Sequence, residues 1–113
     1  MELRLLAHVE SFTTKDGSTI RELHHTAAQS LAEASLEAGQ ATQRHYHART
    51  EEIYLLTAGG GVLDVDGESR EVVAGDAVLI PPGAWHELVA GADGARLLCT
   101  CAPPYSHDDT YFE

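Results

Sequence analysis

Two histidines, His45 and His47, stand one residue apart and are followed by a pair of glutamates, Glu51 and Glu52. On an extended strand, side chains two residues apart point to the same face, about 6–7 Å from each other, so two imidazoles can converge on one ion. A third histidine, His86, follows a rigid Pro-Pro-Gly stretch. Three imidazoles and one carboxylate make a mixed nitrogen and oxygen donor set, which suits Fe(II), Mn, Ni, Co, Cu or Zn better than Ca or Mg. A single strand histidine is more often a half-buried polar residue, so the metal hypothesis depends on the whole conjunction.

The elements that must position these residues are short strands. Glycine and proline recur at short intervals, and the stretches between them have strand character: 19–23, 52–57, 62–65, 70–73, 77–81, 85–90 and 95–101. Many short strands separated by turn residues are typical of a β-sandwich or barrel. Asp66-Gly67 predicts a tight hairpin turn, and residues 81–83 predict a turn between two further strands.

Residues 27–39 carry conflicting signals. Their alanine, leucine, glutamate and glutamine favour a helix. However, Ala32, Ala34 and Leu36 alternate with Glu33, Ser35 and Glu37, which is a period of two with an acidic outer face. The pattern therefore predicts a strand over residues 31–38.

Composition limits the class of protein. At 113 residues the chain fits one domain, and 7 basic against 18 acidic residues give a formal net charge of −11. This charge repels phosphate backbones, so nucleic acid is not expected as a partner. We find neither an apolar run long enough for a membrane span nor a secretory leader, so we expect no membrane partner and a cytoplasmic location. Cys99 and Cys101 do not make a disulfide framework and are expected to be reduced.

The spacing of the candidate ligands resembles the two sequence motifs of the cupin family. The first motif, G-x5-H-x-H-x3,4-E-x6-G, is matched by residues 39–59. The second, G-x5-P-x-G-x2-H-x3-N, is matched by residues 75–90 except at its last position, which is Ala90 and does not bind metal in the family. The count to Gly59 fits Glu52, whereas from Glu51 the interval is one residue too long.

The resemblance implies an all-β fold, a double-stranded β-helix or jelly-roll barrel of two antiparallel sheets, as a single cupin domain over residues 1–113. It also implies one divalent transition metal ion (Fe, Mn, Ni, Zn, Co or Cu). Its expected ligands are His45, His47, Glu52 and His86. Residues 1–30 are expected to form N-terminal strands with contacts in a homodimer, and residues 102–113 a tail over the barrel.

Three further residues are candidates for catalysis. Tyr54 shares the strand face of Glu52 and could line the cavity, while Tyr105 and His107 lie in the tail and could reach the mouth of the barrel. Tail residues of this kind are more often solvated. Cys99 and Cys101 share one strand face, either as small buried apolar residues or as a soft pair beside the metal.

The expected function is that of a metal-dependent enzyme on a small polar metabolite. The ion would act as a Lewis acid with open coordination positions, in isomerase-like or lyase-like chemistry, or in Fe(II) dioxygenase-like chemistry. The alternative is a non-catalytic cupin that binds a sugar-like small molecule. A transcription regulator is disfavoured because the chain shows no helix-turn-helix pattern and no basic region.

Overall fold

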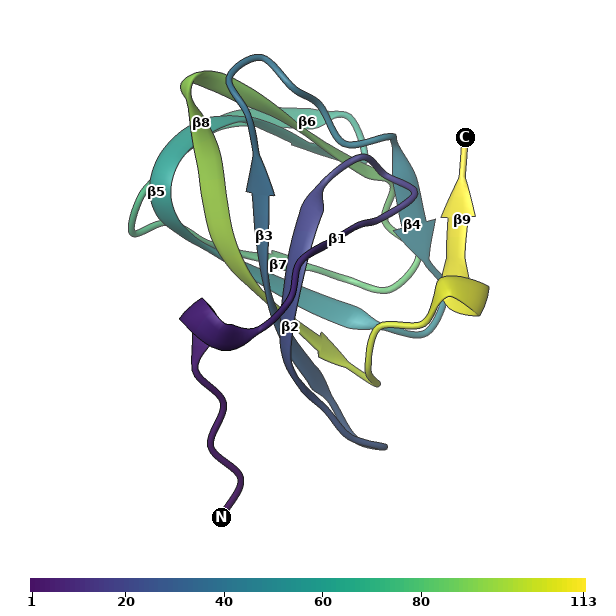
Figure 1. The fold of residues 1–113 in the computed structure, drawn as a ribbon. Helices are drawn as coiled ribbons and strands as arrows, with labels where there is room; N and C mark the ends of the chain where they lie inside the picture. The colour runs from purple at the N-terminus through teal and green to yellow at the C-terminus, as the bar shows by residue number, and fades with distance from the viewer.

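The computed structural model describes residues 1–113, and it is built almost entirely of antiparallel strands (Figure 1). The elements are η1 (Leu6–His8), β1 (Phe12–Thr13), β2 (Thr19–His25), β3 (Ser30–Leu36), β4 (His45–His47), β5 (Glu51–Val65), β6 (Glu68–Val73), β7 (Ala77–Ile80), β8 (His86–Ala102), η2 (His107–Asp109) and β9 (Thr110–Phe112). The predicted all-β fold is confirmed. No helix in the structure is long and apolar enough to cross a membrane.

Two long strands hold the barrel together. β5 and β8 pair along most of their lengths; β5 also pairs with β7 through its first half and with β6 through its second half. On its other side β8 pairs with β3 and β4, and the strands there follow the order β1-β2-β3-β8-β4-β9. The two expected sheets are therefore joined into one nine-stranded sheet that curls around a common interior (Figure 1).

β5 is continuous where the sequence suggested two strands. Its pairing with β8 changes register between Leu56 and Ala58 and again between Gly59 and Gly61. Gly59 has a φ of +65°, and a Cβ there would collide with the carbonyl oxygen of Gly94. A Cβ on Gly61 would likewise collide with the carbonyl oxygen of Val89. Glycine therefore lets β5 bend around the barrel at these positions without ending.

The turns were predicted correctly, although one connection differs. Asp66 and Gly67 both have positive φ, 50° and 88°, as the tight turn between β5 and β6 requires. The turn at residues 81–83 does lie between β7 and β8, but these two strands do not pair with each other, because both pair with β5.

The predicted strand over residues 31–38 is confirmed as β3 (Ser30–Leu36). Ala32, Ala34 and Leu36 line the interior as expected. Glu33 does not line the interior, in agreement with the expected alternation, but it is only 6% exposed. Its cross-strand neighbours are Arg21 on β2 and Leu98 on β8, and their long side chains share its face of the sheet and cover it.

Candidate metal centre

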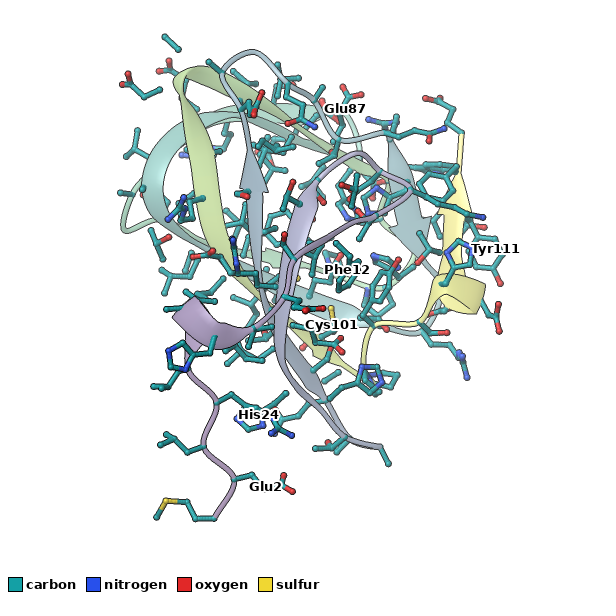
Figure 2. All side chains as sticks on the ribbon, viewed as in Figure 1. Glu2, Phe12, His24, Glu87, Cys101 and Tyr111 are labelled. Atoms are coloured by element: carbon teal, nitrogen blue, oxygen red, sulfur yellow. The ribbon has the colours of Figure 1, made fainter.

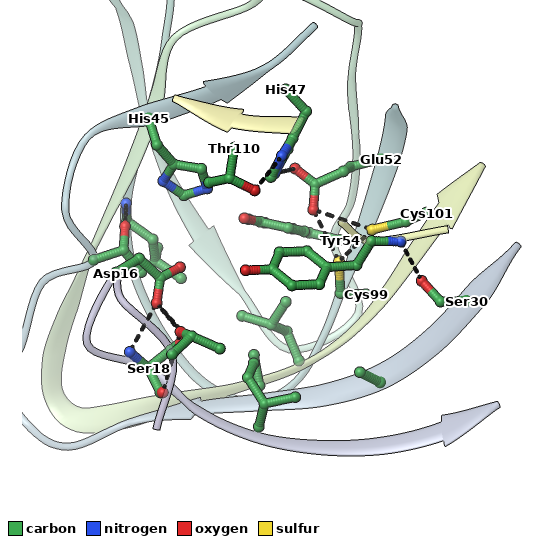
Figure 3. A pocket seen from close by; sticks show the side chains of 18 of the residues that line it. Asp16, Ser18, Ser30, His45, His47, Glu52, Tyr54, Cys99, Cys101 and Thr110 are labelled. Atoms are coloured by element: carbon green, nitrogen blue, oxygen red, sulfur yellow. Dashed lines mark hydrogen bonds and ion pairs between the residues drawn. The ribbon is translucent and has the colours of Figure 1, made fainter. Parts of the chain in front are cut away.

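Four polar side chains converge inside the barrel from three strands. His45 and His47 lie on β4, Glu52 on β5 and His86 on β8, and their donor atoms all lie within 4.8 Å of one another. All four are buried, with exposed fractions of 3%, 4%, 3% and 1% respectively. The pairing of β4 with β8 places His45 directly opposite His86, and alternation along β4 turns His47 to the same side. Figure 3 shows the His45, His47 and Glu52 side chains turned toward one another.

The outer ring nitrogens of the histidines are held by hydrogen bonds. His45 Nδ1 donates to the carbonyl of Gln43 at 2.7 Å, and His86 Nδ1 donates to the carbonyl of Ala84 at 2.9 Å. His47 Nδ1 lies 3.3 Å from the carbonyl of Asp109. Because each Nδ1 faces a carbonyl acceptor, it carries the proton, and the Nε2 lone pair is left free toward the centre. This is the arrangement found around metal-binding histidines.

Two buried atoms at the centre lack a hydrogen bond. Glu52 Oε1 lies 3.1 Å from His47 Nε2 and 3.1 Å from His86 Nε2. Nevertheless, Glu52 Oε1 and His86 Nε2 have no partner with hydrogen-bond geometry. Buried polar atoms are rarely left unpaired, and a cation between these donors would satisfy them. The cluster can therefore hold a metal ion, and its nitrogen-rich donor set fits a divalent transition metal.

The charges in the cluster are unevenly distributed. Burial raises the pKa of Glu52, but the neighbouring His47 and His86 outweigh burial and hold this pKa far below its usual value. Burial lowers the pKa of His47, but the Glu52 carboxylate more than offsets this, so the net shift is upward. The pKa of His45 is lowered by burial and by His86 beside it. Glu52 is therefore ionised, and a proton competes with a metal ion more strongly at His47 than at His45.

Two thiols lie against the other oxygen of the same carboxylate. Cys99 Sγ donates to Glu52 Oε2 at 3.0 Å, and Cys101 Sγ lies 3.5 Å from the same oxygen. The two sulfur atoms are 3.7 Å apart and form no disulfide. The hydrogen bond with Cys101, together with burial, raises the pKa of Cys99. The sequence left the role of these cysteines open; the structure places them beside a candidate ligand.

A pocket adjoins the cluster, and two of the three candidate catalytic residues line it. Tyr54 on β5 and Tyr105 in the tail are among its walls, together with His45, His47 and Glu52. His107 does not line the pocket; it lies in η2 with an exposed side chain. The walls include no lysine or arginine, and apart from Glu52 their charged members are Asp16 and Glu22.

Two aspartates near the cluster were not predicted from the sequence. Asp16 lies in the turn before β2 and lines the pocket; its Oδ1 accepts hydrogen bonds from the backbone and hydroxyl of Ser18 (Figure 3). The Asp-Gly-Ser sequence signalled only the turn. Asp109 in the tail is 3% exposed, and its Oδ2 accepts from the backbone of Arg49 at 3.0 Å and of Thr50 at 3.3 Å. No local pattern indicated this contact, because it joins segments far apart in the chain.

Residues 32–101 match the Cupin domain family, and the chain belongs to the cupins. An uncharacterised protein of Methanocaldococcus jannaschii is 43% identical over 108 residues, which cover 90% of this chain and 86% of that protein. Dimethylsulfoniopropionate lyase DddW of Ruegeria pomeroyi is 41% identical over 66 residues, covering 58% of this chain and 43% of the lyase. Among solved structures, the nucleoside dehydratase Pac13 of Streptomyces superposes with a TM-score of 0.85 at 19% identity, covering 100% of this chain and 91% of that one. This likeness shows the fold.

Proposed function

We propose that this cupin is a metal-dependent enzyme that acts on a small molecule bound in the pocket. His45, His47, Glu52 and His86 would hold one divalent transition metal ion. The observation that carries the proposal is that Glu52 Oε1 and His86 Nε2 are buried without a hydrogen-bond partner. The Nδ1 atoms of His45 and His86 already donate to backbone carbonyls, so their Nε2 atoms are left for an ion. The similarity to a lyase over 66 residues adds support.

When bound, the ion supplies Lewis-acid chemistry, because it stabilises negative charge that develops on a substrate oxygen. The side chains of the pocket then have separate tasks. Burial raises the pKa of Tyr54, as does the charge of Glu52, and burial also raises the pKa of Tyr105. Both hydroxyls therefore keep their protons near neutral pH and serve as hydrogen-bond donors. Of the two wall carboxylates outside the cluster, Glu22 is engaged with His25, which leaves Asp16 to accept a proton.

The charge of the walls indicates the substrate class. A phosphorylated substrate would place its negative charge against Asp16 and Glu22, with no lysine or arginine to compensate. A neutral or zwitterionic small molecule meets no such penalty, and one carboxylate or enolate oxygen of it would bind at the metal. With Asp16 as proton acceptor, the reaction supported best is an isomerisation or an elimination.

Metal analysis and substrate screening test the proposal together. The protein, purified without a histidine tag, is analysed for metal and then incubated with hydroxy acids, keto acids and onium carboxylates, with and without O2. We expect conversion of a member of this panel without O2, observed by mass spectrometry. Asp16→Asn should slow conversion while metal content is unchanged; Asp108→Asn, on an exposed tail residue, is the matched control. Dependence on O2 would identify a dioxygenase, and stoichiometric binding without conversion would identify a binding protein; either result contradicts the proposal.

A further inference from the structure

We propose that Glu52, Cys99 and Cys101 form a second metal site, selective for a thiophilic ion of the zinc class. It lies beside the histidine cluster and shares Glu52 with it. The donor atoms of these three side chains lie within 4.8 Å of one another. The two sites share Glu52, but the proposal does not rest on the proposed reaction, since neither cysteine belongs to the histidine cluster.

The strand pairing brings these donors together. Glu52 lies directly opposite Cys101 in the pairing of β5 with β8, and Cys99, two residues before Cys101, points to the same face. Figure 2 shows Cys101 within the barrel, and in Figure 3 the Glu52 carboxylate lies between His47 and the two sulfur atoms. Oε1 thus faces the histidines and Oε2 faces the thiols. A carboxylate in this position can bind one ion through each oxygen.

The distances match those of a tetrahedral ion. With metal–sulfur bonds of about 2.3 Å and metal–oxygen bonds of about 2.0 Å, tetrahedral geometry separates two sulfur ligands by about 3.8 Å and a sulfur from an oxygen by about 3.5 Å. The sulfur atoms are 3.7 Å apart, and Cys101 Sγ is 3.5 Å from Glu52 Oε2. The remaining edge, from Cys99 Sγ to Glu52 Oε2, is 3.0 Å and must open by about 0.5 Å, the difference between 3.5 and 3.0 Å.

The charges and the access also fit. A divalent ion that binds two thiols displaces their protons, so the two thiolates cancel its charge and the buried site gains no net charge. Both cysteines line the pocket, so an ion can enter from it and its fourth ligand can be water. Sulfur donors select zinc-class ions over the harder ions that prefer nitrogen and oxygen.

Cobalt titration of the metal-free, reduced protein tests the site, because Co²⁺ replaces zinc and reports its own ligands by absorption. We expect two Co²⁺ per chain, with a sulfur-to-cobalt charge-transfer band that grows with one of the two equivalents. Cys99→Ser/Cys101→Ser should bind one Co²⁺ and show no such band. His45→Ala/His86→Ala should keep the band, which separates this site from the histidine cluster. Thr100→Ser, between the cysteines on the exposed face, is the matched control.

Two results would overturn the proposal: absence of the charge-transfer band in the unaltered protein, or persistence of the band in the double serine variant. The first would mean that the thiols only hydrogen-bond to Glu52. Far-ultraviolet circular dichroism of each variant checks that it is folded. If the double serine variant fails to fold, the single variants Cys99→Ser and Cys101→Ser are titrated instead, and each should lose the band or reduce it strongly.

Discussion

The outer nitrogens of the histidines distinguish this cluster from a set of ordinary buried histidines. Packing alone does not require the free nitrogen lone pair of a buried histidine to point toward the lone pairs of two other histidines. Here His45 and His86 each donate Nδ1–H to a carbonyl two residues earlier in the chain, so local backbone geometry fixes both ring orientations. His47 differs, because its Nδ1 contacts the distant tail at Asp109 and Thr110. The orientations of the His45 and His86 rings are therefore set locally, and that of the His47 ring depends on tertiary structure.

Replacing His47 with alanine should remove one of four metal ligands. We expect a loss of affinity larger than the roughly 10–100-fold that follows from loss of a ligand's hydrogen-bond partner. The barrel should remain folded, since its core is a separate cluster of apolar side chains. Competition with a chromogenic chelator measures the affinity. His24→Ala is the control, because His24 lies on β2 outside the cluster (Figure 2), and a loss of metal in that variant alone would refute the ligand assignment.

Metal affinity should fall as the pH is lowered, and the fall should begin at a pH above the ordinary pKa of histidine. His47 binds metal only when neutral, and its pKa in the metal-free protein is raised from 6.5. A proton therefore competes with the ion already as the pH falls through that raised value.

The stability of the metal-free protein should depend on pH in the opposite direction. The stability contributed by protonated His47 is fully present below 6.5 and is lost as the pH rises through its raised pKa. Urea unfolding at several pH values, with and without metal, should show the two opposite trends.

At the level of elements, the strand that carries two candidate ligands, His45 and His47, depends on the tail. β4 has three residues and a single pairing with β8, at His45 and His86, whereas all three residues pair with β9. Tyr46 faces away from the cluster and stacks on Tyr111 of β9, with ring centroids 4.9 Å apart. Residues 102–113 were expected to lie over the barrel as a tail; in the structure, part of this segment is a strand of the sheet.

Asp109→Ala should loosen this tail. The change leaves the backbone N–H groups of Arg49 and Thr50 without their acceptor, and at the buried Thr50 this costs about 1–3 kcal/mol. Metal affinity should fall as well, because the Asp109 carbonyl that holds His47 would be less well fixed. Chemical denaturation and chelator competition measure the two effects. Asp108→Ala, an exposed neighbour, should change neither, and equal effects of both substitutions would argue against a role for the buried carboxylate.

The sequence predicted those elements whose signals are local. Asp66-Gly67 indicated its hairpin, and the alternation around Ala32 to Leu36 outweighed helix propensity. The continuity of β5 through Gly59–Gly61 was not predictable, because glycine usually marks a turn and here permits close approach of another backbone. The four-residue donor set followed from motif spacing. Asp16, Asp109 and the contact of both thiols with Glu52 depend on pairings between distant segments, which no local pattern encodes.

At the level of the whole molecule, part of the surface is more apolar than a lone barrel requires. Ile53 and Leu79, paired across β5 and β7, are 42% and 56% exposed, and Leu3 and Leu5 near the N-terminus are exposed as well. The accessible area of 6527 Å² exceeds the roughly 6100 Å² typical of a monomer of 12.2 kDa. β1, at one end of the sheet, also leaves an open edge.

We therefore expect a homodimer in solution. Sedimentation equilibrium over a range of protein concentrations measures its mass, and Ile53→Glu should shift the equilibrium toward monomer if this apolar face is in the interface. A matched Glu51→Gln change, on the same strand at an exposed position, should leave the mass unchanged. Only monomer at high concentration would contradict the expectation of a dimer.

The separation of the ligands along the chain has a consequence for the order of events in folding. The cluster needs residues 45–52, residue 86 and the tail around residue 109 to be in place together, so it exists only after β5 has paired with β8 and β9 has paired with β4. Such long-range pairings form slowly. An ion that requires the finished site cannot speed its formation, so metal should leave the refolding rate unchanged and slow unfolding instead. Stopped-flow refolding with and without a chelator would show this: a bound ion would slow the opening of a barrel that has already closed, whereas the chain would reach its fold without the ion.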